Sequence, residues 1–248
     1  SITGTVGGQQ ALARLITDAR AGTIAGLTIT AADAALAGGT TRLGPGGQDG
    51  VIRVETTQEQ SYADTLELAA DTTLNSRGNL TFTGAVQGDG VPGRDLAVNS
   101  VGDTQFTAGV ANLASLSTDT ALTGGELHIN GATTVATQTY GEATTTLSGS
   151  FTGNRFEVKG DSVIAGPTTI TMASDTVSFR KSINAKNSSI DSMLTITSGT
   201  ATTPRGTINL DGAIGDRTKL SGLLVTGGTV NAAATIQTAG DLAITGTA

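Results

Sequence analysis

Short runs that alternate apolar and polar residues constrain this chain more than any other feature. In RFEVK (155–159), Phe156 and Val158 fall on one face, while Arg155, Glu157 and Lys159 fall on the other. A period of two is typical of a half-buried β-strand. Gly, Asn and Asp separate such runs, and these residues favour turns. The pattern predicts an all-β fold. Six further runs share it: VIRVE (51–55), NLTFT (79–83), ELHIN (126–130), TVSFR (176–180), MLTIT (193–197) and TINLD (207–211).

Two segments leave the choice between helix and another structure open. Residues 7–22 place Leu12, Leu15 and Ile16 at helical spacing and are rich in good helix formers. Part of the same segment, LARLITD, matches a Ser- and Thr-rich stretch that would make a poor helix, which favours a strand. Residues 31–39 are compatible with one helical turn or with a loop.

The chain repeats short phrases at long intervals. LARLITD (12–18) returns as LASLSTD (113–119) and more loosely as LSGLLVT (220–226). QSYADTLEL (60–68) is echoed by QTYGEATTTL (138–147). Periodic self-similarity indicates a solenoid, a propeller or an array. We therefore expect one continuous segment of about two and a half long repeats, approximately 1–105, 106–211 and 212–248.

Among these architectures, a parallel β-helix fits best. Propeller blades need tight hairpins and regular aromatic residues, whereas this chain is only 3% aromatic and has no Trp. A narrow interior suits Leu, Ile, Val, Ala and Thr, from which we expect the core to be built. Coils of about 20 residues would give on the order of 12 coils and an elongated rod.

The run from 95 to 147 resembles the filamentous haemagglutinin-like repeats of large bacterial secreted exoproteins. The residues that carry the resemblance are LASLSTD, the Gly124–Gly125 break, QTYG (138–141) and ADTTL (70–74). The likeness is clear over residues 1–150, and SFRKSINAKNSSID (178–191) departs from it. The resemblance implies a right-handed β-helix, exported by two-partner or autotransporter secretion to the bacterial cell surface or beyond, with a role in adhesion or surface structure.

Charge and composition exclude several classes of function. The net charge is -7 and the pI is about 4.6, and a chain without a long basic stretch is a poor ligand for nucleic acid. There is no Cys, so disulfides and thiolate chemistry are excluded. No apolar run is long enough to insert into a membrane, and no signal segment opens the chain. Because the chain starts with Ser and stops inside a repeat, we expect an excised or processed piece of a longer protein.

The candidate catalytic residues are better interpreted as surface residues. His128 is the only histidine, and the alternation directs it outward beside Glu126. The charge pair Arg53 and Glu55, and the row Arg155, Glu157 and Lys159, are the nearest approach to the acidic and basic clusters of carbohydrate-active β-helices. Such rows also solubilise a strand and discourage edge pairing. We predict no catalytic, cofactor-binding or metal-binding residue and no cofactor.

Three other features also favour structural roles. GPGGQDG (44–50) lacks phosphate-loop spacing and does not repeat, so we expect a loop there rather than a calcium site. Tyr62 and Tyr140 occupy matched repeat positions, which indicates a shared packing or turn role. T-x-T runs at 27–30, 80–83 and 194–197 suggest an ice-binding face, but their irregular spacing favours ordinary β-propensity and stacking.

These observations predict a non-enzymatic, extracellular structural or adhesive rod or filament segment. Loops near 31–50 and 184–193 are the expected contact points with a host surface, a neighbouring cell or a carbohydrate, and head-to-tail self-association is compatible with the repeats. Two alternatives remain open. One is a polysaccharide lyase or glycosidase with converging charged side chains. The other is a secretion or assembly domain capped by residues 1–22.

Overall fold

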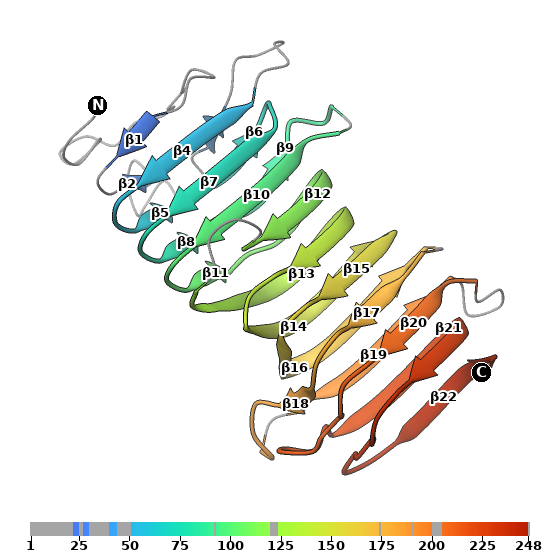
Figure 1. Cartoon of the computed structure of the whole chain (residues 1–248). Coiled ribbons are helices and arrows are strands. Elements are labelled where there is room, and N and C mark those ends of the chain that lie inside the picture. Colours follow the sequence, from blue (N-terminus) through green and yellow to red (C-terminus); the bar gives the residue numbers. More distant parts are fainter. Residues whose placement is uncertain are drawn as a thin grey trace. The chain divides into compact units, whose positions relative to one another are not determined.

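The computed structural model consists of parallel strands, and no helix occurs in the part of the chain that it describes (Figure 1). The described residues are 22–24, 27–29, 40–43, 51–91, 93–119, 124–173, 175–189, 191–199 and 205–247. The chain divides into two compact units, residues 1–128 and 129–248. The all-β, parallel β-helical fold expected from the alternation is therefore confirmed.

In the first unit, each coil contributes strands to three rows, which we call rows A, B and C. Row A holds β1 (Gly22–Ile24), β4 (Ile52–Thr56), β7 (Thr72–Ser76), β10 (Asp95–Ser100) and the end of β12 (Val110–Thr118). Row B holds β2 (Leu27–Ile29), β5 (Gln60–Tyr62), β8 (Leu80–Phe82) and β11 (Thr104–Phe106). Row C holds β3 (Thr40–Leu43), β6 (Thr65–Leu68), β9 (Val86–Gly88) and the start of β12.

The second unit is built the same way, from rows D, E and F. Row D holds the end of β13 (Glu126–Tyr140), β15 (Arg155–Val158), β17 (Val177–Phe179), β20 (Thr207–Leu210) and the end of β21 (Gly222–Ala232). Row E holds the starts of β14 (Thr144–Gly153) and β16 (Asp161–Met172), then β18 (Ile183–Ala185). Row F holds the ends of β14 and β16, then β19 (Met193–Ser198), the start of β21 and β22 (Leu242–Thr247).

Parallel register joins each coil to the next. Successive partners in row A are Ile52, Thr72, Leu96 and Leu116, which lie 20, 24 and 20 residues apart. In row D, Val177 pairs with Ile208, which is 31 residues later. The described part of the chain forms about nine turns. This is fewer than the 12 expected from a uniform 20-residue coil, since several coils carry extra loop residues.

The interior is a set of side-chain ladders that run from coil to coil. In row B, the ring of Phe82 stacks between Tyr62 and Phe106, with centroid distances of 5.2 and 4.5 Å and interplanar angles of 9°. In row D, Phe156 contacts Tyr140 and Phe179. All five Phe and both Tyr are buried. The expectation of a core built only from small aliphatic residues and Thr was therefore wrong, because identical ring positions stack efficiently in a solenoid.

The matched tyrosines do share a role, as the repeats predicted. The Tyr62 hydroxyl donates to Gln60 Oε1 at 2.9 Å, and the Tyr140 hydroxyl donates to Gln138 Oε1 at the same distance. Each glutamine amide in turn donates to backbone carbonyls of strand residues. The Gln60 amide donates to Asn75, and the Gln138 amide donates to Val135 and Thr152. The Q-x-Y phrase thus satisfies buried polar groups inside a coil.

One glycine marks a close approach between coils. Gly149 has φ +110, a conformation that L side chains rarely adopt, and a Cβ at this position would lie 2.2 Å from the Gly131 carbonyl oxygen. The strand pairing shifts register there, between Leu147 and Gly149. Only glycine fits both the backbone conformation and the spacing between the two coils.

Several expectations concern residues outside the described part of the chain. LARLITD (12–18), the helix-or-strand segment 7–22, the cap at 1–22, residues 31–39 and the GPGGQDG loop (44–50) all fall there, apart from Gly22 in β1. The second copy of the opening phrase is described: Leu113 and Leu116 of LASLSTD are buried, as expected for a wall strand. The boundaries proposed for the long repeats stay a prediction.

Candidate functional site

His128 lies on the outer face of β13, as the alternation predicted, and its neighbours Leu127 and Ile129 are buried. Its Nε2 is 3.5 Å from Glu126 Oε2, and its side chain is 39% exposed. Glu126 therefore lies within reach of this histidine, on the same outer face. The pair is open to solvent, where a His–Glu contact contributes little.

Arg53 and Glu55 also lie on the outer face, on β4. The distance from Arg53 Nε to Glu55 Oε1 is 3.9 Å, and both side chains are well exposed. Glu55 Oε1 also accepts a hydrogen bond from Asn75 Nδ2 in the next coil. The Asn75 side-chain oxygen in turn accepts one from Asn99 Nδ2 at 2.9 Å. The pair therefore begins a polar ladder across three coils, which links them laterally.

The row Arg155, Glu157 and Lys159 is arranged differently from the expectation. Glu157 is nearly buried because Arg155 and Arg180 cover it, with Arg155 Nη2 and Arg180 Nε each 3.0 Å from its carboxylate. Arg180 Nη1 also reaches Asp211 Oδ2 at 3.2 Å. Lys159 is exposed, and no ion pair joins it to this network among the described residues.

The electrostatics of this network suit stabilisation better than proton transfer. Burial raises the pKa of Glu157, but hydrogen bonds and charges from Arg180 and Arg155 outweigh burial and hold that pKa below its ordinary value. A general acid for glycoside chemistry needs a raised pKa so that it keeps its proton near neutral pH. Glu157 is instead a fixed carboxylate that ties β15 to the coils after it.

A second network in row C was not found from the sequence. Arg94 binds Asp89 through two contacts of 3.1 Å, and Arg42 reaches the same carboxylate at 3.3 Å. Arg42 also pairs with Glu67. Hydrogen bonding from Arg94 is the main reason that the pKa of Asp89 is lowered. Asp89 and Arg94 are five residues apart, but Arg42 is 25 residues from Glu67 and 47 from Asp89, so local patterning carries no sign that the three coils meet here.

Asp119, the last residue of LASLSTD, is a buried carboxyl at a corner. It has φ 48, and its Oδ1 accepts a hydrogen bond from the Ser100 amide at 2.9 Å, while Oδ2 has no partner in the described part. Burial raises the pKa of Asp119 to about 6, although backbone hydrogen bonds from Ser100 and Gly124 act in the opposite direction. The motif therefore ends in a pH-sensitive structural group.

Row F carries an outward ladder of threonines. Parallel register places five of them in line, one from each successive coil: Thr152, Thr171, Thr197, Thr226 and Thr245. The spacing of these threonines in the sequence is irregular because loops of different length separate the strands. In space, the register is regular. The neighbouring outward line is mixed: Ser150, Thr169, Thr195, Leu224 and Ala243.

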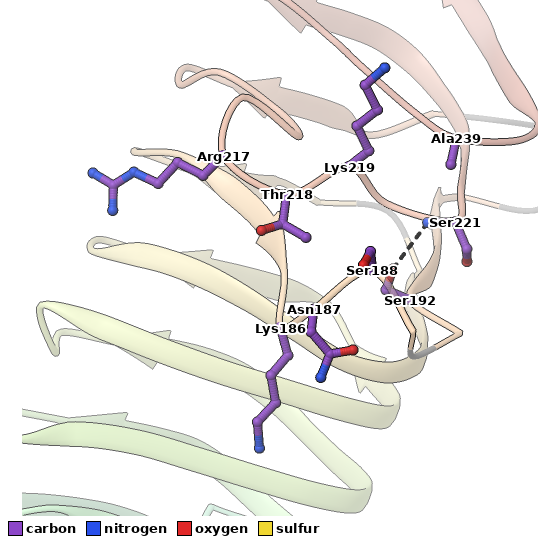
Figure 2. Close-up of a pocket in the computed structure, with 9 residues that line it drawn as sticks. All are labelled: Lys186, Asn187, Ser188, Ser192, Arg217, Thr218, Lys219, Ser221 and Ala239. Carbon is purple, nitrogen blue, oxygen red and sulfur yellow. Dashed lines mark hydrogen bonds between the residues drawn. The ribbon is translucent and has the colours of Figure 1, made fainter.

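The best candidate binding site is a groove of about 580 Å³ in the second unit (Figure 2). We call it the basic groove. Cationic side chains stand at its rim, and Figure 2 shows them extending in three different directions, whereas Ser192 and Ser221 lie next to each other and are joined by a hydrogen bond. The lining residues are Lys186, Asn187, Ser188, Ser192, Arg217, Thr218, Lys219, Ser221 and Ala239.

Two consecutive wide loops form this groove. In the preceding coil, β16 passes the same corner as one uninterrupted strand through Gly166 and Pro167. The next coil instead inserts 186–192 between β18 and β19, and the coil after that has 215–221 between Ile214 and β21. The first insertion matches the loop expected near 184–193. The second was missed, although GDRTKLS (215–221) has the polar and glycine residues of a loop.

Hydrogen bonds brace the two loops against each other. Asn184 Oδ1 accepts from the amides of Arg217 and Thr218 at 3.0 and 3.2 Å. The Ser221 amide donates to Ser192 Oγ at 3.0 Å, and the Ser221 hydroxyl donates to Asp191 Oδ1 at 2.8 Å. Because Asn184 and Ser192 are buried, the shape of the groove is fixed by the coil stack rather than by its exposed side chains.

Among the described residues, no group of three or more His, Asp or Glu side chains is placed to hold a metal ion. The described part also contains no helix with the length and apolar character required to cross a bilayer. No protein-family model, curated protein or solved structure matches this chain. The resemblance to filamentous haemagglutinin-like repeats therefore stays a prediction.

Proposed function

We propose that this chain is a non-enzymatic structural and adhesive segment of an extracellular bacterial surface protein. The observation that carries the proposal is the continuity of the side-chain ladders. Tyr62, Phe82 and Phe106 stack across three coils, and Phe151, Ile170, Ile196 and Val225 are in register across four. Each coil is fastened to its neighbours by apolar contacts and by strand hydrogen bonds.

Outward side chains reinforce the same connections. The Asn75–Asn99 and Asn209–Asn231 amide pairs, with distances of 2.9 and 2.8 Å, bridge adjacent coils. The Arg180 network bridges β15 to Asp211, which follows β20. A stack linked in this way resists bending and separation of its coils, which is what a spacer or shaft requires. The wide loops that protrude from the stack supply surface for adhesion.

Surface labelling tests this proposal. Antibodies raised against the purified chain should label intact cells that produce the protein, and external protease should remove the label. Label that appears only after cell lysis would refute the surface role. Incubation of the chain with a panel of polysaccharides should release no reducing ends and no unsaturated products. Turnover of any of them would favour a carbohydrate-active enzyme instead.

Head-to-tail association stays a prediction. On β22, Leu242 and Ile244 are 51% and 43% exposed. They are in register with the buried Leu223 and Val225 of the coil before. Sedimentation of the purified chain over a range of concentrations tests whether copies associate.

A further inference from the structure

Positive charge is concentrated around the basic groove. Residues 180–221 contain six Lys or Arg and three Asp, so this segment has a net charge of about +3 in a chain whose total is -7. Three of the six cations line the groove itself. The three groove cations therefore attract an anion to this part of the second unit of an acidic protein.

The groove cations differ from the arginines of the two ion-pair networks. Arg42, Arg94, Arg155 and Arg180 are each neutralised by carboxylates within 3.3 Å. Within the described part, no ion pair joins Lys186, Arg217 or Lys219 to an acid. These three charges remain available to a ligand, and their side chains spread away from the groove on different sides (Figure 2).

The floor of the groove has a different chemistry from its rim. Ser188, Thr218 and Ser221 line it with hydroxyl groups, and Asn187 adds a side-chain amide, while the buried Ser192 supports Ser221 through a hydrogen bond. Hydroxyls and amides exchange hydrogen bonds with sugar hydroxyls, whereas binding of single-stranded nucleic acid relies on aromatic stacking platforms. The bracing through Asn184 and Ser192 holds these groups in place before a ligand arrives, which lowers the entropic cost of binding.

We propose that the basic groove binds an acidic polysaccharide. The sugar rings lie over the hydroxyl-lined floor, and carboxylate or sulfate groups along the polymer pair with Lys186, Arg217 and Lys219. The divergence of the three cations favours an extended polymer with spaced charges over a single compact anion. The inference rests on the proposed adhesive role and names its ligand class.

Binding of defined polymers to the immobilised full chain tests the inference. The probes are polygalacturonate, dextran sulfate, neutral dextran and a single-stranded DNA oligonucleotide, at physiological ionic strength. The K186A/R217A/K219A variant should bind polygalacturonate or dextran sulfate roughly ten- to a hundredfold more weakly than the unmodified chain. The preferred acidic polymer identifies the anionic group. Neutral dextran should not bind.

A charge-matched variant separates the groove from general electrostatics. R77A/K159A/R205A removes three exposed cations elsewhere, so it has the same net charge and should keep affinity within about threefold. The K186R/K219R variant keeps the charges and should retain binding. Circular dichroism should show that every variant is folded, because the substituted side chains are exposed.

Three results would overturn the inference. The first is an equal loss of affinity in K186A/R217A/K219A and R77A/K159A/R205A. The second is that neither polygalacturonate nor dextran sulfate binds, and the third is that DNA binds more strongly than both of these polymers. None of them would alter the surface labelling expected of the proposed function. Conversely, if surface labelling fails but the chain still binds the acidic polysaccharide, only the proposed surface role is refuted, and the assignment of the groove stands.

Discussion

Replacement of Phe82 by Ala should be among the most damaging single changes in the first unit. The ring is fully buried and stacks on Tyr62 at 5.2 Å and on Phe106 at 4.5 Å. Truncation of a buried Phe to Ala costs about 3–5 kcal/mol. Because ring contacts on two sides are lost, each worth about 0.5–1.5 kcal/mol beyond burial, we expect a loss of about 4–5 kcal/mol in the free energy of unfolding.

Chemical denaturation followed by circular dichroism measures this loss. Thr81, the neighbouring residue on β8, points outward, so Thr81→Ala is the matched control and should cost less than about 1 kcal/mol. If Phe82→Ala does not fold, Phe82→Leu keeps most of the volume and should cost about 1.5 kcal/mol. If the Phe82 variant loses no more stability than Thr81→Ala, the idea that the aromatic ladder holds the coils together is refuted.

Three further predictions concern charge and backbone. Asp119 has a folded-state pKa of about 6, above its unfolded value, so the contribution of Asp119 to stability is fully present below about pH 4 and is lost as the pH rises through 6. Asp119→Asn should abolish that part of the pH profile of the unfolding free energy, and an unchanged profile would contradict the assignment. Glu157 has a lowered pKa, so its contribution to the free energy of unfolding is present above its unfolded pKa and is lost as the pH falls. In urea titrations, Glu157→Gln should therefore destabilise the chain by about 1–3 kcal/mol at pH 7 and by much less at pH 3. Gly149→Ala should lower the free energy of unfolding by about 3 kcal/mol or more, measured by thermal denaturation. Gly90→Ala is the control, because Gly90 also has a positive φ but has open space around it, and this change should cost about 1 kcal/mol. Equal costs would argue against the close approach of the coils at Gly149.

Much of the fold could be predicted because the strands and coils of a solenoid produce local alternation and repeats in the sequence. The alternation around Phe156 and Val158 specifies which side chains face inward, and the structure buries both. The recurrence of Q-x-Y indicated a shared role for Tyr62 and Tyr140, which the matching hydrogen bonds confirm. Aromatic ladders were missed, because rarity in the composition says nothing about whether the few rings occupy equivalent positions.

The candidate site was predictable only in part. A protruding loop near 184–193 was expected, and residues between β18 and β19 form one wall of the basic groove. The other wall was missed, since nothing local indicates that Arg217 and Lys219 lie beside Lys186. Their nearness results from coil stacking, in which Ile214 pairs with Ile183 across 31 residues. The enrichment of Lys and Arg over 180–221 was the available signal.

The strand alternation, the repeats and hence the stacked parallel coils follow from the amino-acid sequence, because a period of two and a recurring phrase are local properties of the chain. Which residues of different coils meet depends on how the coils stack. Loops of unequal length separate Thr152, Thr171 and Thr197 unevenly along the chain, yet backbone hydrogen bonding brings them into one ladder. The same register covers Glu157 with Arg180 and joins two loops into a groove. Register is a property of paired strands, and it exists only once the coils have closed on one another.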